Sequence, residues 1–200
     1  MLRRKAEGHT IGWLIMTGML ESTGWPADSV RTRDAEIAEV ANLIGVDTVW
    51  KLNLPPARLD ALPMADIVAR VAAVIQEFRP AEVYVPYRGD VHSDHHVTFD
   101  AVTACTKWFR HPSVQRILSY ETPSETDFGL APGASFTPTV FMDISRYLER
   151  KLEIISVYAS ELGVPPFPRS VDGLRALGKV RGAASGFPAA EAFQLLRERQ

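Results

Sequence analysis

The chain has 200 residues, of which 46% are apolar and 23% charged, and its formal net charge is −2. These values suit one globular domain with a buried core, and they give no bulk attraction to nucleic acid or to an anionic membrane. The single cysteine, Cys105, excludes an internal disulfide, and no stretch has the length of a membrane span or the pattern of a signal peptide. We therefore expect one domain over residues 1–200, with the cytoplasm as its default location.

Strands and helices are predicted to alternate along most of the chain. Short apolar runs bounded by turn residues indicate strands at 10–17, 48–52, 82–86, 114–120 and 140–144. Helical spacing of apolar residues and capping signals indicate helices at 29–44, 65–78, 97–110, 146–158 and 171–180, and a last helix from about residue 188. This order predicts an α/β class, with a Rossmann-like three-layer fold and a mostly parallel sheet.

The first residues resemble the end of a helix. Basic residues occupy the expected last turn, and Gly8 follows at the C′ position. Because a helix end that leads into a strand implies an earlier strand, we expect the chain to open midway through a βαβ unit. The alternative is a short helix that docks alone. A sheet that lacks a strand exposes an edge and apolar surface, so we predict homo-oligomers or poor solubility.

Three of the five histidines lie close together after the predicted strand at 82–86. The residues from Pro86 to His96 read PYRGDVHSDHH, and we expect them to form a loop before a helix at 97–110. In an open α/β sheet, ligands bind at the carboxyl ends of strands. Neutral imidazole is a good ligand for zinc, and a nearby carboxylate can orient it. The alternative is that these side chains only cap the helix, but their clustering favours a functional site.

Gly89-Asp90-x-His92-x-Asp94-His95 resembles the second signature of the PIG-L (LmbE-like) family of zinc-dependent N-acetylsugar de-N-acetylases. The resemblance continues through residues 79–84, 120–126, 136–144, 151–158, 181–182 and 190–193. It implies a single PIG-L/LmbE-like deacetylase domain that removes an N-acetyl group from a sugar or sugar-nucleotide. The resemblance also suggests a place in surface-polysaccharide or glycoconjugate biosynthesis, and a partner that is an N-acetylated sugar rather than nucleic acid.

The resemblance assigns roles to individual residues. It implies that His95 is the metal ligand and that His92 stabilises the tetrahedral oxyanion or protonates the leaving amine, while Asp94 orients an imidazole. It implies substrate contacts at Arg33, Arg88, Asp90, Glu121 and Arg181. Two of these have structural alternatives: Arg33 on a solvated helix face, and Arg181 as a tie between the tail and the body. The loop at 121–138 is a further candidate for sugar contacts.

The sequence departs from the family at one motif. A His-Pro-Asp-Asp-Glu loop, which supplies a His and an Asp to the metal and a second Asp as general base, is absent from these residues. With one ligand where a catalytic zinc needs about three, we expect zinc or another divalent metal to bind weakly, and we expect the domain to be incomplete at its N-terminal side. Two functions remain open: a metal-dependent deacetylase, and a non-catalytic remnant or sugar-binding protein.

Overall fold

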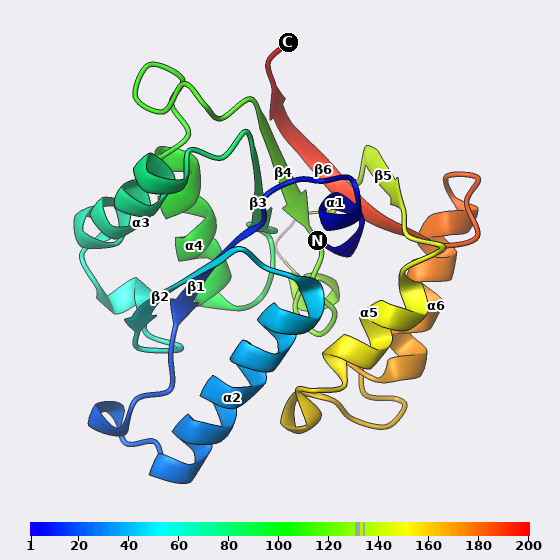
Figure 1. Ribbon diagram of the computed structural model, residues 1–200, viewed down its shortest axis with the longest axis horizontal. Coiled ribbons are helices and arrows are strands. Elements are labelled where there is room, and N and C mark those ends of the chain that lie inside the picture. Colours follow the sequence, from blue (N-terminus) through cyan, green and yellow to red (C-terminus); the bar gives the residue numbers. More distant parts are fainter. Residues whose placement is uncertain (131–132, 134) are drawn as a thin grey trace. The chain divides into compact units, whose positions relative to one another are not determined.

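The computed structural model describes residues 1–130, 133 and 135–200. Part of the predicted sugar-contact loop, residues 131, 132 and 134, therefore lies outside the described residues. The helices are α1 (Leu2–Ala6), α2 (Ala27–Ile44), α3 (Met64–Phe78), α4 (Ser93–Ala104), α5 (Leu148–Ile155) and α6 (Val171–Ala183) (Figure 1). The strands are β1 (Gly12–Thr17), β2 (Thr48–Leu54), β3 (Glu82–Pro86), β4 (Arg116–Tyr120), β5 (Val140–Asp143) and β6 (Ala190–Glu198). The α/β class predicted from the sequence is confirmed.

The described strands form two sheets. Strands β1 and β2 pair in parallel, and the second sheet has the order β3-β4-β6-β5. Strands β3 and β4 are parallel, whereas β6 runs antiparallel to β4. The parallel pairs agree with the βαβ pattern in the sequence, and β6 makes the second sheet a mixed one.

The chain divides into two compact units. The first contains residues 1–55 and 141–191, and the second contains residues 56–140 and 192–200. The single domain expected from the sequence stays a prediction.

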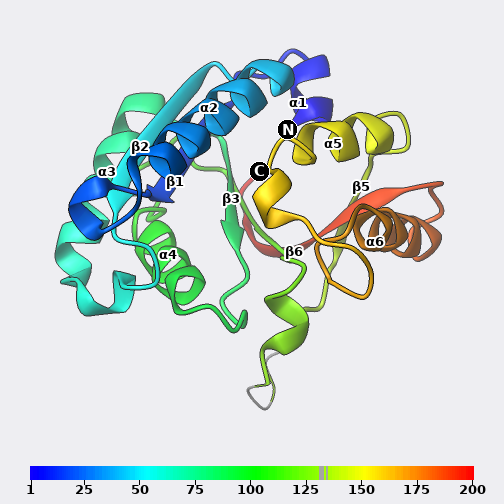
Figure 2. The ribbon, with the colours of Figure 1, turned by 90° about the horizontal axis from the view of Figure 1, so that it is seen from below.

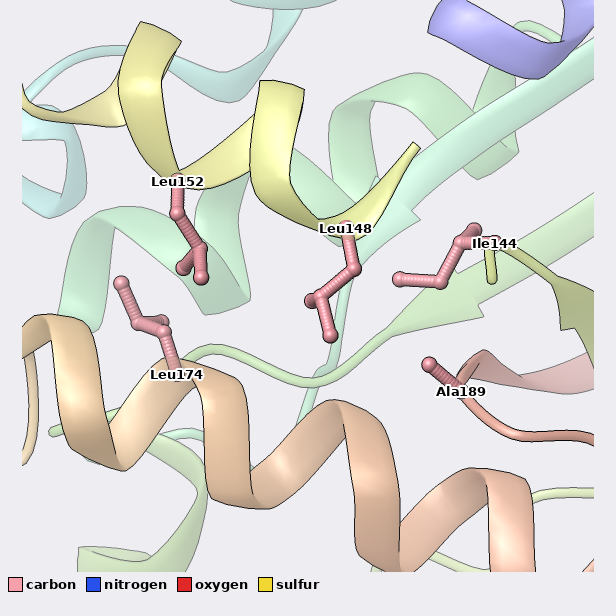
Figure 3. Close-up of a cluster of buried hydrophobic side chains, with 5 residues drawn as sticks. All are labelled: Ile144, Leu148, Leu152, Leu174 and Ala189. Atoms are coloured by element: carbon pink, nitrogen blue, oxygen red, sulfur yellow. The ribbon is translucent and has the colours of Figure 1, made fainter. Parts of the chain in front are cut away.

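The core of the first unit lies between α5 and α6. Leu148 and Leu152 point from α5 toward α6, and Leu174 of α6 points back toward them (Figure 3). Ile144 and Ala189 extend this cluster, and all five residues are at most 9% exposed. Burial of each large aliphatic side chain stabilises the fold by about 1.5–3 kcal/mol.

The core of the second unit contains one face of α3. Ile67, Val71 and Ile75 are spaced four residues apart and are buried, as the helical pattern predicts. Helix α3 packs beside α4, which the ribbon shows in both views (Figure 2). The predicted bounds of α3 and β3 are confirmed to within one residue. Across the described residues, no helix is both long enough and apolar enough to cross a membrane.

The last predicted helix is wrong, because residues 190–198 form strand β6. Ala, Glu, Gln and Leu favour helix locally, but here the segment pairs with β4 over Arg116–Tyr120. Ala190, Ala192 and Phe193 are buried. The ring of Phe193 meets that of Tyr84 edge to face, with centroids 5.3 Å apart. Tertiary pairing has overridden the intrinsic propensity.

Two predicted helix boundaries also need correction. Helix α4 spans Ser93–Ala104 rather than 97–110, so Trp108 lies beyond it and is 60% exposed. Helix α5 spans Leu148–Ile155, and its N-cap residue is Tyr147 rather than Ser145. The hydroxyl of Ser145 instead donates to the carboxylate of Asp143. In both helices the apolar spacing locates the element, whereas the actual cap fixes where it begins.

Candidate functional site

The histidine cluster lies at the start of α4, directly after strand β3. A turn follows Pro86, where the N–H of Asp90 donates to the carbonyl of Tyr87 over 3.2 Å. Residue His92 is the N-cap of α4, and the remaining histidines of the cluster belong to the first helical turn. The predicted loop is therefore shorter than expected. The alternative raised by the sequence, a capping role, applies to His92 itself.

His95 is held by a buried carboxylate. Its Nδ1 lies 2.6 Å from Oδ2 of Asp90, whose side chain is fully buried. The other oxygen of Asp90, Oδ1, accepts from the hydroxyl of Thr126 over 2.6 Å. Because an ionised carboxylate only accepts, Nδ1 of His95 carries the proton in this contact. Its Nε2 then holds the lone pair, which is the form that binds a metal or accepts a proton.

In His92 and His96 the hydrogen-bond partners place the proton on Nε2, the other ring nitrogen from that of His95. The backbone N–H of Asp94 donates to Nδ1 of His92 over 3.1 Å, so a neutral His92 carries its proton on Nε2. Nε2 of His96 contacts the carbonyl oxygen of Asp90, which can only accept. The rings of His92 and His95 stack with centroids 5.3 Å apart. One imidazole of this pair therefore offers a donor, and its neighbour offers a lone pair.

Asp94 binds the backbone of residues 57 and 59 to the start of α4. It is 7% exposed, and its two oxygens accept from the backbone N–H groups of Ala57 at 2.7 Å and Leu59 at 3.1 Å. In this structure the carboxylate that holds an imidazole is thus Asp90, whereas the sequence reasoning gave that role to Asp94. The observed contacts of Asp94 connect the start of α4 to the short helix η2 (Leu59–Ala61).

The charge of Asp90 also affects two tyrosines. Burial raises the pKa of Tyr87, and the negative charge of Asp90 adds to that rise. Burial raises the pKa of Tyr120 to about 12, again with a contribution from Asp90, although 37% of the Tyr120 surface is exposed. Both phenols therefore stay protonated near neutral pH and offer O–H donors rather than bases.

The loop after β4 lies against the histidine cluster. The N–H of Val91 donates to the carbonyl of Glu125 over 3.1 Å. A Cβ added to Gly129 would lie 1.9 Å from the carbonyl oxygen of Gly89, so only glycine permits this approach. Strands β3 and β4 are parallel neighbours, and the residues that follow them therefore meet at the same edge of the sheet.

A comparison with protein families bears on this site. The family model described as PIG-L: GlcNAc-PI de-N-acetylase matches residues 1–106, which is more than half of the chain. The chain belongs to the PIG-L family. The matched residues include the whole histidine cluster and α4.

Solved structures share the fold of this PIG-L chain. The N,N′-diacetylchitobiose deacetylase of Pyrococcus horikoshii is 18% identical, with a TM-score of 0.76 over 98% of this chain and 76% of that one. Teicoplanin deacetylase Orf2, solved in a zinc-inhibited form, is 14% identical, with a TM-score of 0.70; the match covers 100% of this chain and 92% of that one. The 4-carboxy-2-hydroxymuconate hydratase GalB of Pseudomonas putida KT2440 is 15% identical, with a TM-score of 0.71; the match covers 100% of this chain and 89% of that one.

These likenesses confirm the Rossmann-like α/β fold. They do not choose a reaction, because deacetylases and a hydratase share the architecture. The chemistry of this PIG-L chain has to be argued from its own side chains.

The donor atoms around His95 do not complete a catalytic metal site. Both oxygens of Asp90 and both oxygens of Asp94 already accept hydrogen bonds. Within residues 1–130, 133 and 135–200, no three His, Cys, Asp or Glu residues are grouped so that they could hold a metal ion. A catalytic zinc takes three protein ligands. The described residues therefore supply at most one protein ligand, Nε2 of His95, rather than a complete catalytic metal site, and no step proposed below is written through a metal.

The predicted substrate residues fall in both units. Glu121 and Arg88 belong to the same unit as the histidines, and Arg88 forms a two-pronged ion pair with Asp100 at 2.7 and 3.1 Å. Arg33 and Arg181 belong to the other unit, which is described by itself.

Within that unit, Arg33 is part of a polar network. Its Nη2 lies 2.6 Å from Glu161, its Nε lies 3.2 Å from Glu36, and its guanidinium stands over the ring of Tyr158. These contacts connect α2 to the segment after α5. They match a structural tie more closely than the solvated helix face considered from the sequence.

Sequence reasoning missed Thr126. The family resemblance includes this residue but gives it no role, because its contact with Asp90 spans 36 positions. The available signal was its place after β4, the parallel neighbour of β3, which brings its loop to the same sheet edge as the histidines.

Proposed function

We propose that this PIG-L chain hydrolyses the N-acetyl group of a sugar or sugar-nucleotide, giving a free amine and acetate. Membership of the de-N-acetylase family supports this reaction class. The observation that carries the proposal is the stacked pair of His92 and His95, which offers a donor and a lone pair from neighbouring rings. Amide hydrolysis needs both kinds of group: a lone pair is needed beside the attacking water, to accept its proton or to hold a metal, and a donor is needed where charge develops on the carbonyl oxygen.

His92 is proposed to act on the transition state. Its Nδ1 is occupied by the N–H of Asp94, so Nε2–H is the group it presents. A fixed N–H donor aimed at the developing oxyanion stabilises the tetrahedral intermediate. Delivery of a proton to the leaving amine would also require a proton on Nδ1, where the N–H of Asp94 already donates, so this contact favours the oxyanion role. Both roles use the same nitrogen, and a change of this residue should affect turnover.

His95 is proposed as the residue that this chain contributes to a divalent-metal site, with zinc as the first candidate. Its Nδ1–H contact to Asp90 resembles the way that carboxylates orient metal-binding imidazoles in general. Because a single protein ligand holds zinc poorly, we expect these 200 residues to bind zinc weakly. Equilibrium dialysis that retained one tightly held zinc per chain would contradict this expectation.

Substrate contacts are proposed at Arg88, Glu121, Arg33 and Arg181, as the family resemblance implies. Asp90 is assigned differently, because it is 1% exposed and both of its carboxylate oxygens are already bonded. We also propose a cytoplasmic location and a pathway that builds surface polysaccharides or other glycoconjugates.

The proposal is tested by acetate release from a panel of N-acetylated sugars and sugar-nucleotides, with zinc added in excess to offset weak binding. We expect release of acetate in equal amount to free amine, and none from the matched O-acetylated sugars. Isothermal titration with the same panel measures binding separately. Binding without acetate release at every zinc concentration would overturn the enzyme and support the second candidate, a sugar-binding protein. Among the residues that the structure describes, the set of metal donors is incomplete, and this observation favours the alternative.

A further inference from the structure

We propose that Thr126 is a positioning residue that fixes the tautomer and orientation of His95 through Asp90. The consequence for the reaction rate rests on the proposed function, whereas the tautomer itself does not. The family resemblance runs through Thr126 in the loop after β4 but gives this residue no role.

Three hydrogen bonds in series carry this inference. The backbone N–H of Thr122 donates to Oγ1 of Thr126 over 2.7 Å. That hydroxyl donates its own proton to Oδ1 of Asp90 over 2.6 Å, and Oδ2 of Asp90 accepts from Nδ1–H of His95 over 2.6 Å. Once one group in the series is fixed as a donor or an acceptor, the next group has to be the opposite. The direction of every proton therefore follows from the backbone N–H at its start.

Because Asp90 is buried, its contact with His95 depends on the hydroxyl of Thr126. The side chain of Asp90 is fully buried, so water cannot replace a lost donor at Oδ1. A buried carboxylate oxygen without a donor is unfavourable, and the side chain responds by rotating toward another donor. This rotation weakens the contact at Oδ2. His95 then loses the contact that places its proton on Nδ1.

The loop that carries Thr126 is itself held in place. The N–H of Val91 donates to the carbonyl of Glu125, and Gly129 closely approaches the carbonyl of Gly89. These contacts lie on either side of Thr126 and do not involve its hydroxyl. Removal of the hydroxyl should therefore leave the loop where it is and change only the series of hydrogen bonds.

The chain offers a conservative variant and a matched control. Thr126→Ser keeps a hydroxyl that can accept from Thr122 and donate to Asp90, whereas Thr126→Val has the same shape as threonine and can do neither. Thr122→Val removes a hydroxyl from the same loop. Among the described residues, Oγ1 of Thr122 is buried and has no hydrogen-bond partner, so its loss should not disturb His95.

The experiment is the 15N–1H correlation spectrum of the imidazole rings, recorded at alkaline pH, where ordinary histidines are neutral. In the wild-type chain we expect His95 as the Nδ1–H tautomer and both His92 and His96 as Nε2–H tautomers. In Thr126→Val the His95 signals should move to a mixture or to the Nε2–H form. His92 and His96 serve as internal controls, because their anchors are backbone groups.

Thr126→Ser and Thr122→Val should both keep the wild-type pattern at His95. The inference is overturned if Thr126→Val leaves the His95 tautomer unchanged, or if Thr126→Ser loses it as completely as valine does. It is also overturned if all three histidines change together, which would show general disruption of the loop rather than a positioning effect.

The rate provides a separate test. Outer contacts of this kind are typically worth about 10-fold to 100-fold in activity, so we expect kcat of acetate release to fall by at least about 10-fold in Thr126→Val and to be restored by Thr126→Ser. If the wild-type chain shows the expected tautomers but releases no acetate from any sugar, the proposed function fails and the positioning role stands. If acetate is released and kcat is unchanged in Thr126→Val, the positioning role fails and the function stands.

Discussion

At the scale of single residues, hydrogen-bond partners rather than residue types distinguish the histidines. His92 and His95 are chemically identical side chains three positions apart, yet a backbone N–H holds one and a buried carboxylate holds the other. Asp90 and Asp94 differ in the same way, since one orients an imidazole and the other fixes backbone. Spacing in the sequence could locate this cluster but could not assign the roles of the two aspartates, because their deciding contacts come from residues 57, 59 and 126.

The contacts of Asp94 predict a large loss of stability when it is removed. Asp94→Ala leaves the N–H groups of Ala57 and Leu59 without their acceptor. Ala57 is exposed and its N–H can bond to water, whereas Leu59 is buried, and an unpaired buried donor costs about 1–3 kcal/mol. We expect the free energy of unfolding to fall by about 1–3 kcal/mol in urea titrations. The control is Asp100→Ala in the same helix, whose ion pair with Arg88 is exposed and contributes at most about 1 kcal/mol. Equal losses in the two variants would contradict this account of Asp94.

At the scale of secondary structure, the sequence predicted elements best where local rules decide them. Helix α3 has a continuous apolar face, and strand β3 is a short β-branched run closed by proline, so both were located correctly. Helix α4 was placed too late because histidine is not among the usual N-cap residues, although His92 accepts the capping bond here. Strand β6 was missed because its partner, β4, lies some 75 residues earlier in the chain.

The assignment of β6 gives a direct prediction. Backbone carbon chemical shifts of residues 190–198 should have strand values, and the amides that pair with β4 should exchange slowly with solvent. Helix α6, a segment of comparable length in the same chain, serves as the reference for helical shifts. Helical shifts over residues 190–198 would contradict the sheet order β3-β4-β6-β5.

Asp47, just before β2, accepts from Lys5 of α1 and from Ile11 before β1, and these contacts predict an acid-sensitive link. The hydrogen bond from the backbone N–H of Ile11 is the largest cause that lowers the pKa of Asp47 below its ordinary value of 3.8. The hydrogen bond from the side chain of Lys5 lowers it further. A lowered pKa means that the unfolded chain binds the proton more readily, so Asp47 contributes stability above pH 3.8, and this contribution is lost as pH falls through and below that value. The melting temperature of Asp47→Asn should therefore fall less steeply than that of the wild type between about pH 5 and pH 3. Parallel curves would show that Asp47 does not contribute.

At the scale of the whole molecule, the fold and the family could be read from the sequence because their signals are spread along the chain. The alternation of strands and helices and the Gly-Asp-x-His-x-Asp-His motif pointed to a Rossmann-like PIG-L protein, and the family match and similar structures agree. The internal arrangement of the site could not be read in the same way. Thr126 and the backbone of residues 57 and 59 reach Asp90 and Asp94 only through folding, and no local pattern predicts these contacts.

The proposed deacetylation depends most on the different roles of the two stacked histidines, His92 and His95. It is tested most directly by kcat of acetate release from an N-acetylated sugar in His92→Ala, with zinc binding measured on the same sample and His95→Ala as the comparison. We expect His92→Ala to lower kcat by about 100-fold or more while its zinc affinity stays at the wild-type value, because a donor at the transition state is worth this much in rate. His95→Ala should instead lose zinc. Loss of zinc in His92→Ala with retention in His95→Ala, or an unchanged kcat in His92→Ala, would contradict the account.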